Sequence, residues 1–200
     1  MRNGQVYPIV MPPEHLRGLG KPRDWTPEKA QAHFDWFMAL RRQRIDDLLS
    51  FFEVSYPAKG DEHNFLLELG KAVAETMCTE PNFRVTPEKK ELTAPGLAMA
   101  YDMEVFVAEL IVGSSEGVIK WMLLKKPPRA LDLNLPVLVG LPTMKFEPIR
   151  GSLTEAKAIL RGAESSDIWA RTYSFWLERL MNEVIVPVRK GRWLGLTDPN

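Results

Sequence analysis

Apolar residues recur at helical spacing along most of this chain. Thr26 followed by Pro27 predicts a helix start, because the hydroxyl can accept a first-turn N–H and proline has no amide hydrogen to leave unpaired. A helix from Pro27 to about Phe52 gathers apolar side chains on one face. These are Phe34, Phe37, Met38, Ile45, Leu48, Leu49 and Phe52. Arg41 lies in the middle of this face, so we expect its charge to be surrounded by apolar groups.

Two further helices follow the first. Asp61 can cap a helix that runs to about Cys78, in which an apolar stripe lies opposite charged residues. From Pro95 to Val112 the chain is apolar nearly all round, which is typical of a helix buried on most sides. The β-branched residues of this segment would also suit a strand. An uninterrupted length of about 16 residues favours the helix.

Two short apolar runs flank a basic turn that contains two prolines. We pair Trp121–Leu124 with Val137–Val139 as a small antiparallel sheet, because the prolines between them lack the N–H that a ladder requires. The connection from Lys125 to Leu135 is then a surface loop. The segment from Met144 to Ile149 is a candidate third strand.

Two helices complete the pattern. Ser152 and Glu155 have the spacing of a capping box, which predicts a short helix over Leu153–Arg161. The last helix begins at Ser166–Asp167 and ends at Pro187. Its apolar face opposes a polar one, so we expect this face in the main core. The face carries Trp169, Tyr173, Trp176, Leu177, Leu180 and Val184.

The order of these elements predicts an α+β fold, a predominantly helical single domain with a small antiparallel sheet. Two hundred residues are near the usual size of one domain and can bury about 70% of the surface of the unfolded chain. The first 25 residues hold four prolines and three glycines, which predicts an irregular N-terminal arm over 1–25. Residues 26–187 form the predicted domain, and residues 188–200 form a basic C-terminal tail.

Composition narrows the classes of partner and compartment. The 26 basic and 26 acidic residues give no global field that would draw the chain to nucleic acid or to an anionic membrane. A single cysteine, Cys78, excludes an internal disulfide framework, and the first residues lack the apolar core of a secretory signal. No apolar run is long enough to span a bilayer. We therefore expect a cytoplasmic protein with no membrane partner.

Two carboxylates stand out in the apolar helix. Asp102 and Glu109 are seven residues apart, so they lie two turns apart on one face, where they could share acid–base work or bind a cation. The alternative is structural: the pair caps backbone groups or is neutralised by Arg or Lys. The structural role is favoured, because metal centres in helical proteins recruit His or several carboxylates, and no His is near in sequence. We predict no metal and no cofactor, and Asp102 and Glu109 are the catalytic candidates.

A third acid of this helix, Glu104, lies among apolar residues, as Arg41 does in the first helix. A buried charge is costly unless it is paired. We therefore predict that Arg41 and Glu104 form a buried charge pair between the two helices, with Asp102 as the alternative partner of Arg41. A functional pocket at these residues is the less favoured interpretation, because structural ion pairs give the same pattern.

A basic segment follows the predicted Trp121 strand. The window 117–131 contains no acidic residue. Its cations beside Trp121 include Lys125, Lys126 and Arg129. The candidate binding residues for an acidic partner protein are Trp121, Lys125, Lys126 and Arg129. Nucleic acid is a less favoured partner, because few aromatic residues are interleaved with the cations to stack on bases.

Several segments resemble a set of uncharacterised small bacterial proteins. They are AHFDWF near the start, YDMEVFVAELIV with the following Trp121, LNLPVLVG and YSFWLERL, which together span about two thirds of the chain. Similar sequences carry Asp-x6-Glu on a helix, often with Gly before the Glu, then a Trp that opens a strand and an Asn-x-Pro-Val-x-Val-Gly strand. The matching positions are Asp102, Glu109, Trp121, Asn134, Pro136, Val137, Val139 and Gly140. Ala108 replaces the usual Gly. The resemblance implies the fold order and a bacterial source, and no established activity.

The leading hypothesis is a non-enzymatic protein–protein interaction protein of the bacterial cytoplasm, with an immunity-type protein that neutralises a toxin as one form. The alternative is a hydrolase or metal-dependent enzyme that uses Asp102 and Glu109. A nucleic-acid-binding module that acts through the basic patch is the third.

Overall fold

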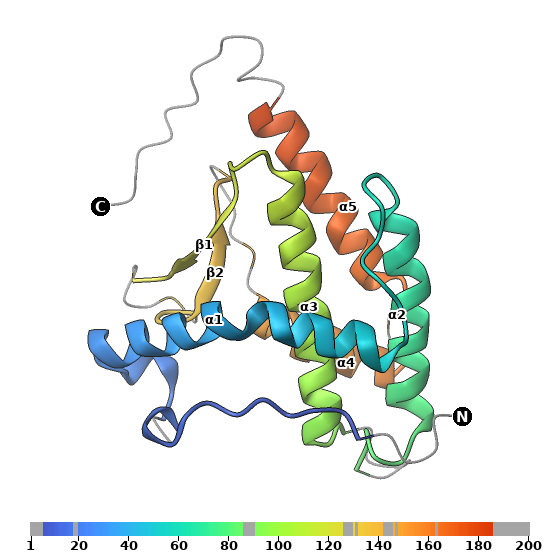
Figure 1. Cartoon of the computed structure of the whole chain (residues 1–200), viewed down its shortest axis with the longest axis horizontal. Helices are drawn as coiled ribbons and strands as arrows, with labels where there is room; N and C mark the ends of the chain where they lie inside the picture. Colours follow the sequence, from blue (N-terminus) through green and yellow to red (C-terminus); the bar gives the residue numbers. More distant parts are fainter. Residues whose placement is uncertain are drawn as a thin grey trace.

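The computed structural model describes residues 6–17, 20–85, 91–125, 130, 132–141, 146, 148–162 and 164–185. This part of the chain folds into five α-helices and one two-stranded sheet (Figure 1). The helices are α1 (Pro27–Phe51), α2 (Glu62–Thr79), α3 (Ala94–Ser114), α4 (Pro148–Leu160) and α5 (Ile168–Leu180), and the strands are β1 (Lys120–Leu123) and β2 (Pro136–Val139). The predicted class, a mostly helical α+β fold with a small antiparallel sheet, is confirmed.

Helix α3 is the centre of the fold. It packs against α1, α2, α4 and α5, and Figure 1 shows α1 crossing it while α5 runs beside it. Side chains on nearly every side of α3 are buried, as expected of a helix that is apolar all round. Thr93 caps its start by accepting a hydrogen bond from the Gly96 N–H at 3.4 Å. The helix interpretation of this segment is confirmed over the strand.

The first two helices begin where the sequence indicates. Thr26 caps α1 by accepting the Lys29 N–H at 3.4 Å. Asp61 is the residue before α2, as predicted, but its side chain makes no capping hydrogen bond. Of the residues described before α1, Glu14–Leu16 and Pro22–Asp24 form short 3₁₀ turns, and residues 6–13 are irregular.

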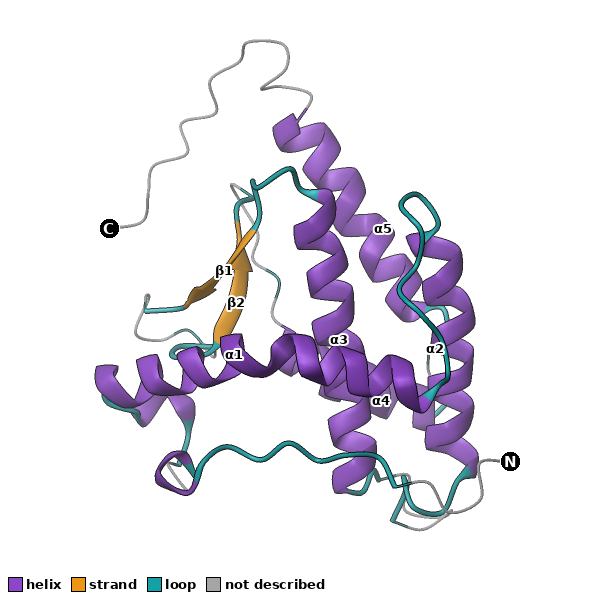
Figure 2. Cartoon of the chain, viewed as in Figure 1, coloured by secondary structure: helices purple, strands orange, loops and turns teal. Residues whose placement is uncertain are grey.

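The two strands pair as predicted. β1 and β2 lie side by side (Figure 2) and pair antiparallel. Trp121 is opposite Leu138, and Leu123 is opposite Pro136. Of the candidate third strand over 144–149, Phe146 makes one antiparallel bridge to Leu138, while Pro148 and Ile149 belong to α4. Residues 142–145 and 147 lie outside the described residues.

The capping box predicted at Ser152 is also wrong. Helix α4 begins at Pro148, so Ser152 and Glu155 lie inside the helix and not at its start. Proline suits the first turn because its fixed φ is preorganised for a helix and it has no N–H to leave unpaired. The end of the helix agrees with the prediction, since Gly162 adopts φ +69° just beyond it.

The aromatic face of α5 lies in the core. Trp169, Tyr173 and Trp176 are 0%, 3% and 7% exposed, which confirms their predicted burial. Asp167 precedes the helix, as predicted, and a π-helical turn at Met181–Ile185 follows it. The predicted tail, residues 188–200, lies outside the described residues. In the part of the chain that the structure describes, no helix combines the length and apolar character needed to cross a membrane.

Candidate functional site

The three acids of α3 face two different sides of the helix. Each residue advances about 100° around a helix, so Asp102 and Glu109 share one face and Glu104 lies about 200° from Asp102. Asp102 and Glu109 contact arginines of α1. Glu104 faces α4 and α5, where it meets Glu155 and Trp169. The acids of α3 therefore belong to two separate clusters, one on the side of α1 and one on the side of α4 and α5.

Asp102 is 2% exposed and has two partners. The Tyr7 hydroxyl of the N-terminal arm donates a hydrogen bond of 2.8 Å to Oδ2, and Arg44 Nη2 lies 2.5 Å from Oδ1. The Arg44 guanidinium also lies over the Tyr101 ring, 4.8 Å from its centroid. Burial raises the pKa of Asp102 to about 6, and Arg44 and the Tyr7 hydrogen bond oppose that rise. This carboxylate joins the arm, α1 and α3.

Glu109 holds the sheet to the helices. Its Oε1 accepts a hydrogen bond of 2.9 Å from Arg41 Nε and one of 2.6 Å from Trp121 Nε1. The Trp121 ring also packs against Phe37 of α1, with 4.9 Å between the centroids. Both catalytic candidates, Asp102 and Glu109, are thus neutralised by arginine, as the structural interpretation of the sequence expected.

The predicted charge pair of Arg41 and Glu104 does not form, and neither does its alternative with Asp102. Arg41 pairs with Glu109, and the arginine that meets Asp102 is Arg44. The physical reason is the direction in which α1 crosses α3, which brings the two arginines onto Asp102 and Glu109 and leaves Glu104 on the far side. The second arginine, Arg44, is a site residue that sequence reasoning missed.

Glu104 is completely buried and lies beside a second carboxyl. Burial raises the pKa of Glu104 well above its usual range, the nearby Glu155 carboxyl raises it further, and the Trp169 indole lowers it. Helix α4 passes close to this carboxyl: a Cβ added at Gly151 would lie 3.3 Å from Glu104 Oε2. The contact of Glu155 with Glu104 was not predicted, because the capping-box motif assigns Glu155 to a helix start.

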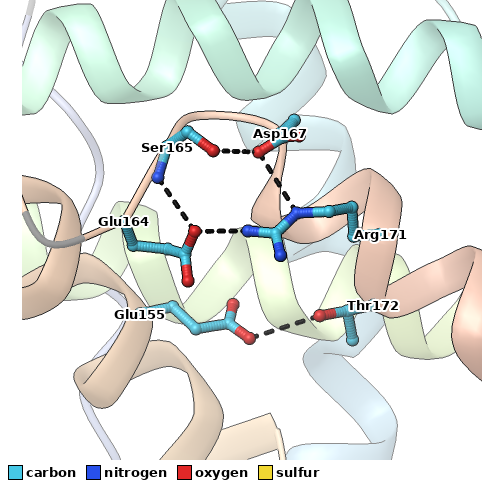
Figure 3. A network of polar contacts seen from close by, with 6 residues as sticks. All are labelled: Glu155, Glu164, Ser165, Asp167, Arg171 and Thr172. Atoms are coloured by element: carbon cyan, nitrogen blue, oxygen red, sulfur yellow. Dashed lines mark hydrogen bonds and ion pairs between the residues drawn. The ribbon is translucent and has the colours of Figure 1, made fainter.

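A polar network borders Glu155 on the α5 side (Figure 3). Thr172 donates a hydrogen bond of 3.3 Å to Glu155 Oε1. Arg171 turns away from Glu155, to Glu164 and to Asp167, whose Oδ1 is 3.3 Å from Arg171 Nε. The network therefore supplies Glu155 with a hydroxyl donor, while the neighbouring guanidinium is used by other acids.

His63 and Ser174 form a contact that the sequence did not indicate. His63 Nδ1 lies 2.7 Å from Ser174 Oγ, the spacing of a base and a nucleophile. Ser174 lies within α5, where helical hydrogen bonds use the backbone N–H groups that would stabilise an oxyanion. Within the described ranges, His63 makes no ion pair with a carboxylate that would orient it. This contact serves to join α2 to α5.

The predicted binding residues are only partly described. Lys120 and Lys125 are exposed at the two ends of the β1 segment, and Trp121 is half-buried between them. Lys126 and Arg129 lie outside the described residues. Among the described side chains, no group of three or more His, Cys, Asp or Glu could hold a metal ion.

Comparisons with known proteins add no assignment: no family model, no curated protein and no solved structure matches this chain.

Proposed function

We propose that this is a non-enzymatic protein-binding protein that docks an acidic partner on β1 and the basic segment that follows it. One observation carries the proposal. Trp121 is fixed to α3 by its hydrogen bond to Glu109 and to α1 by packing on Phe37, while Lys120 and Lys125 on either side are exposed. The cations are thus displayed by a strand that is anchored to the core, and such preorganisation lowers the entropy lost on binding.

Charge supports an acidic partner. The window 117–131 contains no acidic residue, although the chain as a whole is neutral. Exposed cations that lack nearby acids create a local positive potential, which steers an acidic surface toward them and sets the salt dependence of association. A toxin that an immunity-type protein neutralises is one form that such a partner could take.

The enzyme alternative has less support. Asp102 is 2% exposed and Glu109 is neutralised by Arg41, so neither carboxylate is presented to a substrate in this structure. A general acid or base must lie within hydrogen-bond reach of the proton that it transfers. Both carboxylates instead fill structural roles in helix packing.

A titration followed by NMR tests the proposal. The ¹⁵N-labelled full chain is titrated with an oligoglutamate peptide and, separately, with a single-stranded DNA oligonucleotide of matched charge. We expect the peptide to shift the Trp121 indole N–H resonance saturably, and we expect the double reversal Lys120→Glu with Lys125→Glu to abolish this shift. Reversal of the exposed Lys29 and Lys59, far along the chain, is the matched control.

Two outcomes would contradict the proposal. If the oligonucleotide shifts Trp121 at lower concentration than the peptide, the nucleic-acid alternative is favoured. If neither probe shifts it, or the reversal at Lys120 and Lys125 acts no differently from the control, β1 is not a docking element for acidic groups.

A further inference from the structure

Buried polar atoms from three helices meet where α3, α4 and α5 pack together. Glu104 is 0% exposed and lies within hydrogen-bonding reach of the Glu155 carboxyl and the Trp169 indole. In the described structure, four buried atoms have no hydrogen-bond partner of good geometry: the two Glu104 oxygens, Glu155 Oε2 and Trp169 Nε1. Because the two carboxyls lie close together, a proton on one of them supplies the missing donor.

Two ionised carboxylates cannot hydrogen-bond to each other, because neither carries a hydrogen. One shared proton removes the repulsion and supplies the donor, as in other closely spaced carboxyl pairs. Since an isolated buried charge is costly, the buried member of the pair is the one that holds the proton. Glu155 is less buried and accepts the Thr172 hydroxyl, which suits the ionised member.

Among the described side chains, no cation replaces that proton. The arginines of α1 are engaged on the opposite side of α3, Arg41 by Glu109 and Arg44 by Asp102. From α5, Arg171 pairs with Glu164 and Asp167 (Figure 3), and the groups that face the pair are the uncharged Trp169 and Thr172. Of the described side chains of α4, the charged group that faces Glu104 is Glu155.

We propose that Glu104 and Glu155 form a proton-dependent clasp that holds α4 against α3, and that loss of the shared proton releases α4. Because α4 lies close to the buried Glu104 carboxyl at Gly151, α4 must move before water can reach that carboxyl. Helix α4 begins two residues after Phe146, which bridges β2, so release also reaches the sheet. This inference is independent of the proposed binding function.

Hydrogen exchange of the full chain across a pH series tests the clasp. After correction for the intrinsic exchange rate, we expect protection of the α4 amides to fall about tenfold for each pH unit, until the closed form has lost its proton. Glu104→Gln should make α4 protection independent of pH, because a neutral amide cannot lose a proton. Glu155→Gln should weaken the dependence without abolishing it, because burial still favours a protonated Glu104 while the new amide at position 155 can donate to the ionised form. Glu178→Gln, at an exposed position of α5, should leave the wild-type dependence in place.

A pH dependence that persists in Glu104→Gln would overturn the clasp, as would α4 protection in the wild type that does not vary with pH. Infrared spectroscopy of the wild type keeps the proposal testable if the variants do not fold. A carboxylic acid C=O stretching band should be present at neutral pH, and its absence would also overturn the clasp.

Discussion

Helix α3 neutralises its buried acids in two different ways. On the side that faces α1, Asp102 and Glu109 are matched by Arg44 and Arg41. On the side that faces α4 and α5, Glu104 meets a second acid, Glu155. There a shared proton neutralises the acid, as a guanidinium does on the α1 side. The first solution depends on an arginine, and the second depends on pH. Asp102 and Glu104, which represent the two solutions, are two residues apart in the sequence.

Local packing explains the difference. On the α1 side an arginine reaches each acid, both where the pair is partly exposed, as Arg41 and Glu109 are at 24% and 13%, and where it is buried, as Arg44 and Asp102 are at 5% and 2%. On the α4 side Glu104 is 0% exposed, and a Cβ added at Gly151 would lie 3.3 Å from its Oε2, so a residue with a long side chain at position 151 would meet the carboxyl. Where a counter-ion does not fit, a carboxyl is buried in its neutral form.

The largest effect should come from Arg44→Ala. This change leaves Asp102 buried without its ion-pair partner, and breaking a buried pair in this way costs about 3–5 kcal/mol. Urea unfolding measures the loss, with the exposed Arg42→Ala as the matched control. Adding Asp102→Asn to the Arg44 variant should restore part of the stability, because it removes the orphaned charge. Equal, small losses for Arg44→Ala and Arg42→Ala would show that the pair is not structural.

Glu104→Gln should increase the folding stability, whereas Arg44→Ala decreases it. A neutral amide fits the clasp without needing a proton, so the variant should gain stability over the wild type as pH rises. The gain should reach about 1–3 kcal/mol, the usual range for relieving an unsatisfied buried polar group. Denaturation at acidic and alkaline pH measures it. A variant that is less stable than the wild type at alkaline pH would contradict the protonated state of Glu104.

The folding stability of the wild type should decrease with rising pH because of Asp102. Burial raises its pKa from 3.8 to about 6, so between these two values the folded state keeps a proton that the unfolded state has released. Stability therefore decreases as pH rises through this window, by up to about 1.4 kcal/mol for each pH unit. Asp102→Asn should make this part of the curve shallower, and the slope that remains comes from Glu104, whose pKa is also raised by burial. Stability that rises over the same window would mean that Arg44 outweighs burial.

The smallest effect should come from Arg41→Ala. This ion pair is partly exposed and screened, so its loss should cost about 1 kcal/mol or less. Trp121 keeps its own hydrogen bond to Glu109, and its fluorescence should therefore change little. A loss as large as that of Arg44→Ala would remove the distinction between the two ion pairs of the α1 side.

Local signals predicted most of the fold. The Thr26-Pro27 start, the all-round apolar character of α3 and the prolines between β1 and β2 each depend on neighbouring residues. The start of α4 was missed because two local signals compete there. Pro148 and the Ser152 capping box both mark helix starts, and the proline prevails.

The pairing of side chains was not predictable in the same way. Arg41 and Arg44 lie about 60° apart around α1, so either could face α3, and the crossing direction decides which acid each one meets. Glu155 carries no sequence signal for a partner that lies on another helix. Its role depends on how α4 packs on α3, which is a property of the tertiary structure.

The most direct test of two modes of burial on one helix is a ¹³C NMR titration of the α3 side-chain carboxyls in the folded wild type. We expect the Asp102 carboxyl to titrate near pH 6, raised by burial and held in check by Arg44. We expect Glu104 to remain protonated well above the range of an ordinary glutamate. If Glu104 is instead ionised throughout the neutral range while α4 stays packed on α3, the proton does not take the place of an arginine, and the comparison between the two sides of α3 fails.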